Sequence, residues 1–175
     1  MRFLNLLFFF CFALISCVSK DNQQNEFLFL PAIENKIKEL EKHNYKLHQF
    51  IAKDSLQDTL LLDSVTWKKE FSLFFDNAIS KKKLNNYTLS KSNTSRGTRE
   101  ELIAKDQKQS IRKVSFSQKK DGSFMYTAHI VKKNRLSEII YNIEFDSNKG
   151  YLISSSQILP YSYHTLFRIE GIFTP

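Results

Sequence analysis

Residues 139–153 read Ile-Ile-Tyr-Asn-Ile-Glu-Phe-Asp-Ser-Asn-Lys-Gly-Tyr-Leu-Ile, and this stretch decides the predicted fold. In its first half, apolar residues occupy every second position from Ile139 to Phe145. A period of two places alternate side chains on one face of a β-strand. The cluster Asn148-Lys149-Gly150 is typical of a turn, and a second apolar run follows it. Because so short a turn joins only antiparallel strands, the stretch predicts an antiparallel hairpin.

The same alternation continues on both sides of this hairpin. Upstream, Asp121-Gly122 is a strong hairpin signal between two apolar runs, one of which carries Phe124, Tyr126, Ala128 and Ile130 on one face. Downstream, beyond Pro160, the residues Phe167, Ile169 and Phe173 alternate with polar residues. The second half of the chain therefore predicts an antiparallel meander of about five strands.

The first half of the chain has a helical period instead. After Pro31, which suits the first turn of a helix, one stripe recurs at spacings of three and four. Its members are Ile33, Ile37, Leu40, Asn44, Leu47 and Ile51, with the Asn as an interruption. A second helix is expected over residues 55–80, with a broad apolar face formed by Leu56, Leu60, Trp67, Phe71, Phe74, Phe75 and Ile79.

These elements predict an α+β fold, in which two N-terminal helices pack on one face of the meander. Residues 85–98 are mostly polar and are expected to form a loop, with a possible short strand at Tyr87-Thr88-Leu89. Residues 98–104 stay open between two structures. Thr98 and Glu101 fit a helix capping box, whereas Glu101-Leu102-Ile103-Ala104 fits a strand.

The N-terminus has the features of an export signal. Arg2 precedes an almost wholly apolar run over residues 3–15, which is shorter than the roughly 20 residues that a spanning helix needs. The run ends in Leu14-Ile15-Ser16-Cys17, which resembles the lipobox of bacterial lipoprotein precursors. The resemblance implies that the Cys17 thiol receives a diacylglyceryl group, that the chain is cut before Cys17, and that the new amine is acylated with a chain such as palmitate.

The expected organisation follows from this resemblance. Residues 1–16 would be the signal peptide, residues 17–30 the lipidated cysteine with a flexible tether, and residues 31–175 a single domain. The tether is expected because residues 19–25 are polar and have no apolar period. We expect the mature protein in the cell envelope, held on a membrane by acyl chains on Cys17, with the outer membrane as the expected site.

A second resemblance concerns the domain itself. Dispersed residues are similar to those of small Bacteroidota lipoproteins of unknown function, which carry a Trp-bearing helix and close with a strand of the type aromatic-x-Ile-x-Gly. The matching positions are Trp67, Phe71, Phe75, Tyr87, Phe167, Ile169 and Gly171. The resemblance implies no activity, because the group has none assigned.

Composition limits the partners. The chain has a formal net charge of +8, with lysines in short clusters, but no interleaving of basic and aromatic residues that would favour nucleic acid. We therefore expect no nucleic-acid partner and interpret the lysines as solvated side chains. The two cysteines are Cys11, inside the signal, and Cys17, so the mature protein is expected to lack a disulfide.

No motif in the sequence supports catalysis. The four histidines lack the clustered spacing of a zinc site, no serine stands in the glycine-flanked elbow of a serine nucleophile, and the four glycines form no phosphate-binding loop. We expect neither an enzyme nor a cofactor. The sequence favours a non-catalytic binding or assembly protein of the envelope. The alternative is a carrier that holds an apolar ligand between helices and sheet. Trp67, Phe71 and Phe75 would be core residues in a binding or assembly protein and could line the ligand cavity in a carrier.

Overall fold

The computed structural model describes residues 29–77, 79, 81–159 and 164–175. The longest helix in this part of the chain is α2 (Phe29–Lys42), followed by α3 (Trp67–Glu70), α4 (Ser72–Asp76) and the 3-10 turn η1 (Lys81–Asn86). The strands are β1 (Lys46–Lys53), β2 (Leu56–Leu62), β3 (Tyr87–Thr94), β4 (Gly97–Ala104), β5 (Ile111–Lys119), β6 (Phe124–Lys133), β7 (Glu138–Asp146), β8 (Gly150–Ile158) and β9 (His164–Thr174).

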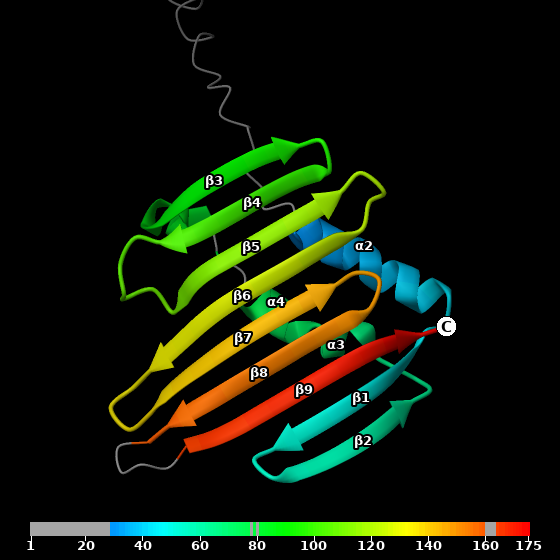
Figure 1. Cartoon of the computed structure of the whole chain (residues 1–175). Coiled ribbons are helices and arrows are strands. Elements are labelled where there is room, and N and C mark those ends of the chain that lie inside the picture. The colour runs from blue at the N-terminus through cyan, green and yellow to red at the C-terminus, as the bar shows by residue number, and fades with distance from the viewer. Residues whose placement is uncertain (1–28, 78, 80, 160–163) are drawn as a thin grey trace, which may run out of the picture.

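The nine strands described form one antiparallel sheet in the order β2-β1-β9-β8-β7-β6-β5-β4-β3 (Figure 1). Strands β3 to β9 follow one another as a meander, and the earlier β1–β2 hairpin adds on beyond β9. Strand β1 pairs with β9 along its whole length, from Lys46 opposite Thr174 to Lys53 opposite Phe167. Strands β2 and β3 are therefore the two edges of the sheet.

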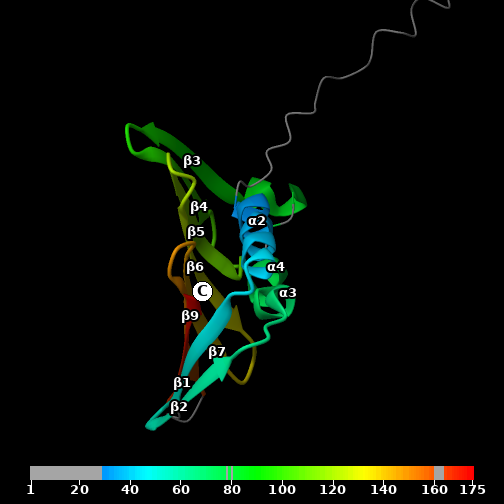
Figure 2. The same ribbon diagram turned by 90° about the vertical axis from the view of Figure 1, so that its right-hand side faces the viewer.

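The described helices all lie on one side of the sheet (Figure 2). We call the covered side the inner face, which carries Tyr126 and Phe145, and the other side the outer face, which carries Met125 and Glu144. Helix α2 turns one stripe toward the inner face, and its buried residues are Phe29, Ile33, Lys36, Ile37 and Leu40.

Aromatic rings fill the space between the helices and the inner face. Phe71, between α3 and α4, is fully buried, and its ring centroid lies 5.3–6.2 Å from those of Trp67, Phe74, Phe145, Tyr151 and Phe173. Farther along the sheet, Tyr126 packs between Phe29 at 4.9 Å and Phe74 at 5.7 Å. Short helices suffice here because large aromatic side chains bury much area each.

The predicted fold class is wrong. The chain is mainly a nine-stranded antiparallel sheet with a few short helices, not two long helices on a meander of about five strands. The error lies in the first half of the chain, where two predicted helices contain the strands β1 and β2.

The first predicted helix ends early, at a residue that the sequence pattern treated as an interruption. Asn44 adopts a left-handed backbone conformation with φ of 51°. Its N–H bonds to the Glu41 carbonyl and the N–H of Tyr45 bonds to the Leu40 carbonyl, a Schellman ending. The chain continues as β1. Leu47 and Ile51 fitted the predicted helical stripe because they are four residues apart. Such a spacing places two side chains on one face both in a strand, where it is two periods, and in a helix, where it is about one turn.

The second predicted helix is divided between a strand and two short helices. Residues 54 and 55 form a tight turn, with Asp54 at φ of 52°, and β2 returns along β1. Leu56 and Leu60 thus belong to an edge strand rather than to a helical face. Only residues 67–76 of the predicted helix are helical, in α3 and α4, and Phe71 between them ends the first and begins the second.

The predicted loop at residues 85–98 is also wrong, except that its possible short strand at Tyr87-Thr88-Leu89 lies inside a longer strand. Residues 87–94 form β3, which pairs with β4 from Tyr87 opposite Ala104 to Thr94 opposite Gly97. The undecided segment 98–104 is thereby resolved as strand. The polar composition suggested a loop, but it suits this edge strand because every side chain after Tyr87 is exposed.

The hairpins predicted from alternation are present. Asp121-Gly122 joins β5 to β6, with Gly122 at φ of 85°. The predicted turn at residues 148–150 lies where β7 connects to β8, with Gly150 already the first residue of β8, and the last predicted strand is β9.

Candidate functional site

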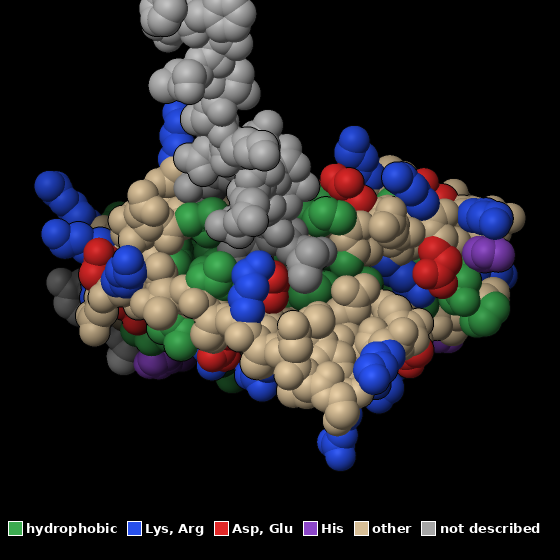
Figure 3. Space-filling view, turned by 90° about the horizontal axis from the view of Figure 1, so that it is seen from above, with side chains coloured by type: hydrophobic (Ala, Val, Ile, Leu, Met, Phe, Trp, Pro, Cys, Tyr) green, Lys and Arg blue, Asp and Glu red, His purple; other side chains and the backbone are tan. Residues whose placement is uncertain are grey.

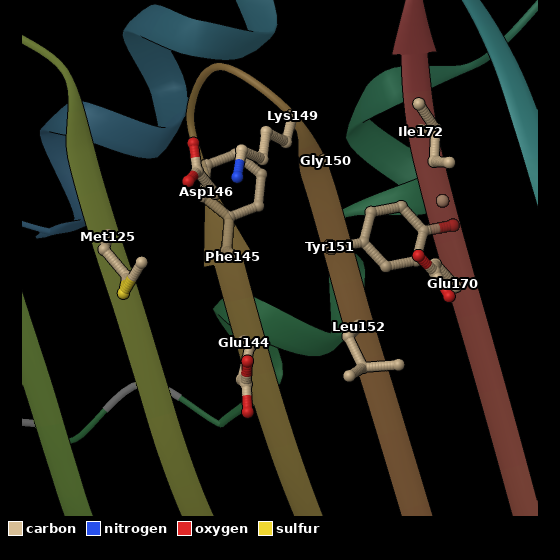
Figure 4. Close-up of a pocket in the computed structure, with 11 residues that line it drawn as sticks. Met125, Glu144, Phe145, Asp146, Lys149, Gly150, Tyr151, Leu152, Glu170 and Ile172 are labelled. Carbon is tan, nitrogen blue, oxygen red and sulfur yellow. The ribbon is translucent and has the colours of Figure 1, made fainter.

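A shallow groove of about 230 Å³ lies on the sheet near the turn between β7 and β8 (Figure 4). Its lining comes from four consecutive strands, β6 to β9, and from the turn. The residues are Met125, Glu144, Phe145, Asp146, Lys149, Gly150, Tyr151, Leu152, Glu170, Gly171 and Ile172. Pockets that enclose small molecules are typically about 300–1,000 Å³. This groove therefore suits one or two side chains of a partner rather than an enclosed ligand.

The groove owes its depth to a missing side chain. Gly150 stands opposite Asp146 on β7 and Ile172 on β9, in a row that begins with Met125 on β6. Its φ of 143° is unfavourable for other residues, and a Cβ there would overlap the carbonyl oxygen of Gly171. Glycine at position 150 thus brings β8 and β9 into close pairing and leaves a gap in the row of side chains.

Carboxylates surround this gap although the whole chain is positively charged. Glu144, Asp146 and Glu170 line the groove, with Lys149 as its one basic residue. Arg168 donates to Glu170 at 3.1 Å on the same strand, whereas Glu144 forms no ion pair with the residues described. The groove therefore combines apolar walls from Met125, Leu152 and Ile172 with a negatively charged rim.

A polar cluster lies at the back of the groove, on the inner face. The Tyr151 hydroxyl donates to Oε1 of Glu70, and Nε2 of Gln49 donates to the same carboxylate oxygen at 3.0 Å and to the Tyr151 oxygen at 2.9 Å. Burial first, and then the neighbouring Glu70 carboxylate, raise the pKa of Tyr151 above its usual range. These bonds attach α3 to β1 and β8, so they hold the helical layer against the sheet.

Gly171 makes room for this cluster. It stands between Gln49 and Tyr151 in one row across β1, β9 and β8. A Cβ at position 171 would overlap carbons of the Tyr151 ring. The ring lies in the space that a side chain at 171 would occupy, which is how its hydroxyl reaches Gln49 and Glu70.

The three aromatic residues singled out by sequence lie in or beside the core. Trp67 is only 2% exposed, with its ring 6.0 Å from that of Phe71 and 5.6 Å from that of Phe173. Phe75 is half-buried against the same cluster. Trp67 also borders a hollow of about 190 Å³ between the end of α2 and the turn after β2. Cys17, the predicted lipidation site, lies outside the described residues.

The remaining polar groups form no metal-binding cluster in the described part of the chain. His129 shares a hydrogen bond of 2.8 Å with Asn142 on the outer face. Within residues 29–77, 79, 81–159 and 164–175, His, Cys, Asp and Glu nowhere gather in threes that could hold a metal ion. The same residues include no helix long and apolar enough to cross a membrane. Figure 3 shows basic side chains spread around the molecule between acidic ones, not gathered in one patch on that side.

Sequence reasoning did not find the groove or the Gln49–Glu70–Tyr151 cluster. Gly150 was assigned to a turn, and nothing in the sequence showed that Ile172 would stand opposite it. The available signal was the pair Gly150 and Gly171, since an isolated glycine in a strand often marks a close approach. Comparisons with protein-family models, curated proteins and solved structures found no match to this chain.

Proposed function

We propose that this chain is a lipoprotein of the bacterial cell envelope, anchored through Cys17, whose outer sheet face docks a partner protein. The observation that supports docking is the uncovered outer face. Phe50, Met125 and Ile172 are exposed there, with Leu152 half-buried between them. We call these four residues the outer-face patch. Met125, Leu152 and Ile172 also line the same groove, and exposed apolar residues with a polar rim are typical of interaction sites.

The groove within this patch indicates the chemistry of the partner. Apolar walls favour an apolar side chain, and the carboxylates of Glu144 and Asp146, which form no ion pair among the described residues, favour nearby Lys or Arg residues. Charge complementarity of this kind mainly sets orientation and association rate, while the buried apolar contact holds the complex. The partner is therefore a protein that presents an apolar side chain flanked by basic residues.

The anchoring half of the proposal rests on the sequence Leu14-Ile15-Ser16-Cys17 after a short apolar run. Acyl chains bind a bilayer by burying methylene groups, at about 0.8 kcal/mol each, and two chains hold much more firmly than one. Cys17→Ala should abolish incorporation of a radioactive fatty acid and block cleavage before residue 17. Equal labelling of the parent and Cys17→Ala chains would rule out the anchor.

Photo-crosslinking in intact cells tests the docking surface. We would place benzoylphenylalanine at Met125 on the outer face and, as the matched control, at Lys38 on the exposed side of α2. The proposal expects a discrete cross-linked product from position 125 alone, and a weaker product when Glu144→Lys reverses a rim charge. No discrete product at position 125, or the same product at both positions, would contradict the docking role.

A further inference from the structure

The edge strand β2 lacks the protection that edge strands usually have. Along its free side no described strand pairs with its backbone groups (Figure 1), although the Thr59 N–H donates to Oδ1 of Asp58 at 2.8 Å on the same strand. Its leucines are exposed, by 73% at Leu56, 39% at Leu60 and 53% at Leu61. Between Leu56 and Leu62 the sequence has no Lys, Arg or Pro, and the pairing with β1 contains no bulge. Natural proteins use such features to block edge-to-edge association.

The opposite edge, β3, is built differently. Its sequence is Tyr-Thr-Leu-Ser-Lys-Ser-Asn-Thr, in which Leu89 is the one exposed large apolar residue, at 40%. Lys91 lies in the middle of this edge and forms a 2.5 Å ion pair with the buried Glu100 on β4. A lysine fixed on an edge opposes the approach of another strand. The two edges therefore differ in kind, and β2 is the one suited to pairing.

The turn between β1 and β2 determines which groups of β2 point outward. Lys53 and Leu56 close a two-residue hairpin, and such a closing pair is hydrogen-bonded. Hydrogen-bonded and non-bonded pairs then alternate along the ladder, so Gln57, Thr59 and Leu61 direct their N–H and C=O groups to the free edge. The side chains of these three residues share the outer face. In a partner strand, the residues whose free N–H and C=O groups pair with β2 must therefore also have their side chains on the outer face.

We propose that the occupant of this edge is a second copy of the chain, which pairs through its own β2, antiparallel, about a two-fold axis at Leu60. A second copy meets this requirement. Thr59 of one copy then stands opposite Leu61 of the other, so that their outward N–H and C=O groups face each other and their side chains share the outer face. Leu60 faces Leu60, and all three residues of the Leu60-Leu61-Leu62 run lie within the overlap. The contact is isologous and closes on itself, which leaves only the protected β3 edges at the ends of the joined sheet.

Charge also favours this register. Asp58 is the sole charged residue of β2. With the axis at Leu60, Asp58 stands opposite Leu62 of the other copy, four residues from its equivalent. At about 3.3 Å per residue, the two carboxylates are about 13 Å apart, beyond the Debye length of about 8 Å at physiological salt. The two Asp58 carboxylates therefore do not meet, and Asp63, one residue beyond Leu62, is paired with Lys46 of its own chain at 2.8 Å.

Pairing of β2 with β3 of another copy fits less well. The two edges run in the same direction, because they occupy the first and ninth positions of an antiparallel sheet. Their contact would be parallel and would set the leucines of β2 against the polar residues of β3. It would also repeat without closing, which produces filaments.

The contact is narrow, so a weak dimer is expected. One pair of edge strands buries less than the roughly 1,200 Å² of a standard stable interface. Two chains held on one membrane would meet at a higher local concentration than free chains, and the dimer would then depend on the anchor proposed above. The β2 contact is nevertheless independent of the outer-face patch, so either proposal can fail alone.

Cysteine cross-linking of the full-length chain, in isolated membranes of the cells that express it, tests the dimer. We would compare Leu60→Cys on β2 with Leu89→Cys on β3, two positions of nearly equal exposure, and use the parent chain to correct for Cys11 and Cys17. Under mild oxidation the Leu60→Cys thiols, held opposite each other, should form a disulfide-linked dimer about ten-fold faster than those of Leu89→Cys.

Two proline variants make the test specific for edge pairing. Thr59→Pro removes an outward N–H of β2 without removing a hydrogen bond to β1, and Asn93→Pro is the corresponding change on β3. In the Leu60→Cys chain, Thr59→Pro should lower the cross-linking rate about ten-fold to the parent background, whereas Asn93→Pro should not, with circular dichroism checking the fold of each. Equal rates at positions 60 and 89, cross-linking that survives Thr59→Pro in a folded chain, or a ladder of higher oligomers would overturn the proposal.

Discussion

Replacing Gly171 by alanine tests whether the fit between β8 and β9 holds the helical layer in place. The added methyl group would overlap the Tyr151 ring, which is buried and packs against Phe71 with centroids 6.2 Å apart. The ring has little free space in that aromatic layer. It must therefore shift, and its hydroxyl must move away from Glu70 and Gln49.

The expected cost has two parts. An extra methyl in a well-packed core typically costs about 1–3 kcal/mol. Loss of the hydrogen bond between Tyr151 and the Glu70 carboxylate adds about 1 kcal/mol, less than for a buried charged acceptor, because Glu70 is half-exposed and water can replace the tyrosine. We expect Gly171→Ala to lower the free energy of unfolding by about 2–4 kcal/mol, a large share of the ~5–15 kcal/mol typical of a domain.

Urea unfolding followed by Trp67 fluorescence and by circular dichroism measures this cost. A double-mutant cycle then isolates its cause. In a Tyr151→Ala chain the ring is absent, so Gly171→Ala should cost less than about 0.5 kcal/mol or even stabilise, since alanine restricts the unfolded chain more than glycine does. Gly122→Ala is the control: its Cβ would meet no atom within 4 Å, but its φ of 85° is unfavourable, so its cost should not depend on Tyr151. An equal cost of Gly171→Ala in both backgrounds would refute the proposed fit.

Three further predictions concern the aromatic core. Trp67→Ala should cost about 3–5 kcal/mol and Trp67→Phe clearly less, as measured by circular dichroism in urea, because a buried ring leaves a void; an Ala variant as stable as the parent would contradict the core position. The Tyr126 hydroxyl is fully buried without a hydrogen-bond partner among the described residues, so Tyr126→Phe should stabilise the chain by about 1 kcal/mol, and a loss of stability would reveal a partner. Burial raises the pKa of Tyr126 and Tyr151 above that of an unfolded tyrosine, so stability should be constant below about pH 10 and fall above it by about 1.4 kcal/mol per pH unit for each tyrosine. Urea unfolding between pH 8 and 11 should show a shallower alkaline decline for Tyr126→Phe, and an unchanged slope would refute that assignment.

The contrast between correct and incorrect predictions follows from how local each signal is. The hairpin at Asp121-Gly122 could be predicted because an αL-tolerant turn and a period of two act within a few residues. The end of α2 could have been predicted from Asn44, which tolerates the left-handed conformation that terminates helices. The prediction instead treated Asn44 as a single polar interruption of a longer helical stripe. The spacing from Leu47 to Ile51 fitted a helix and a strand equally.

Other features depend on partners far away in the chain. Strand β1 is stabilised by β9, which follows it by more than a hundred residues, so its strand conformation is set by tertiary pairing rather than by its own period. The same holds for the candidate site. Gly150 forms part of the groove only because Ile172 stands opposite it. The Tyr151 hydroxyl forms its hydrogen bond only because α3 places Glu70 within reach.

The sequence by itself determined the strands of residues 111–173 and their hairpins, because a period of two and turn residues act locally, and it carries the lipobox prediction for Cys17 unchanged. Only the tertiary structure decided that the described strands form one nine-stranded sheet, that β2 is a leucine-rich edge with no described strand beyond it, and that no described helix covers the outer face (Figure 2). The physical reason is that the apolar character of a residue favours its burial or its place in a strand. It does not determine which other segment the residue packs against. Strand register and strand order determine which segments meet, and both arise only when distant parts of the chain come together.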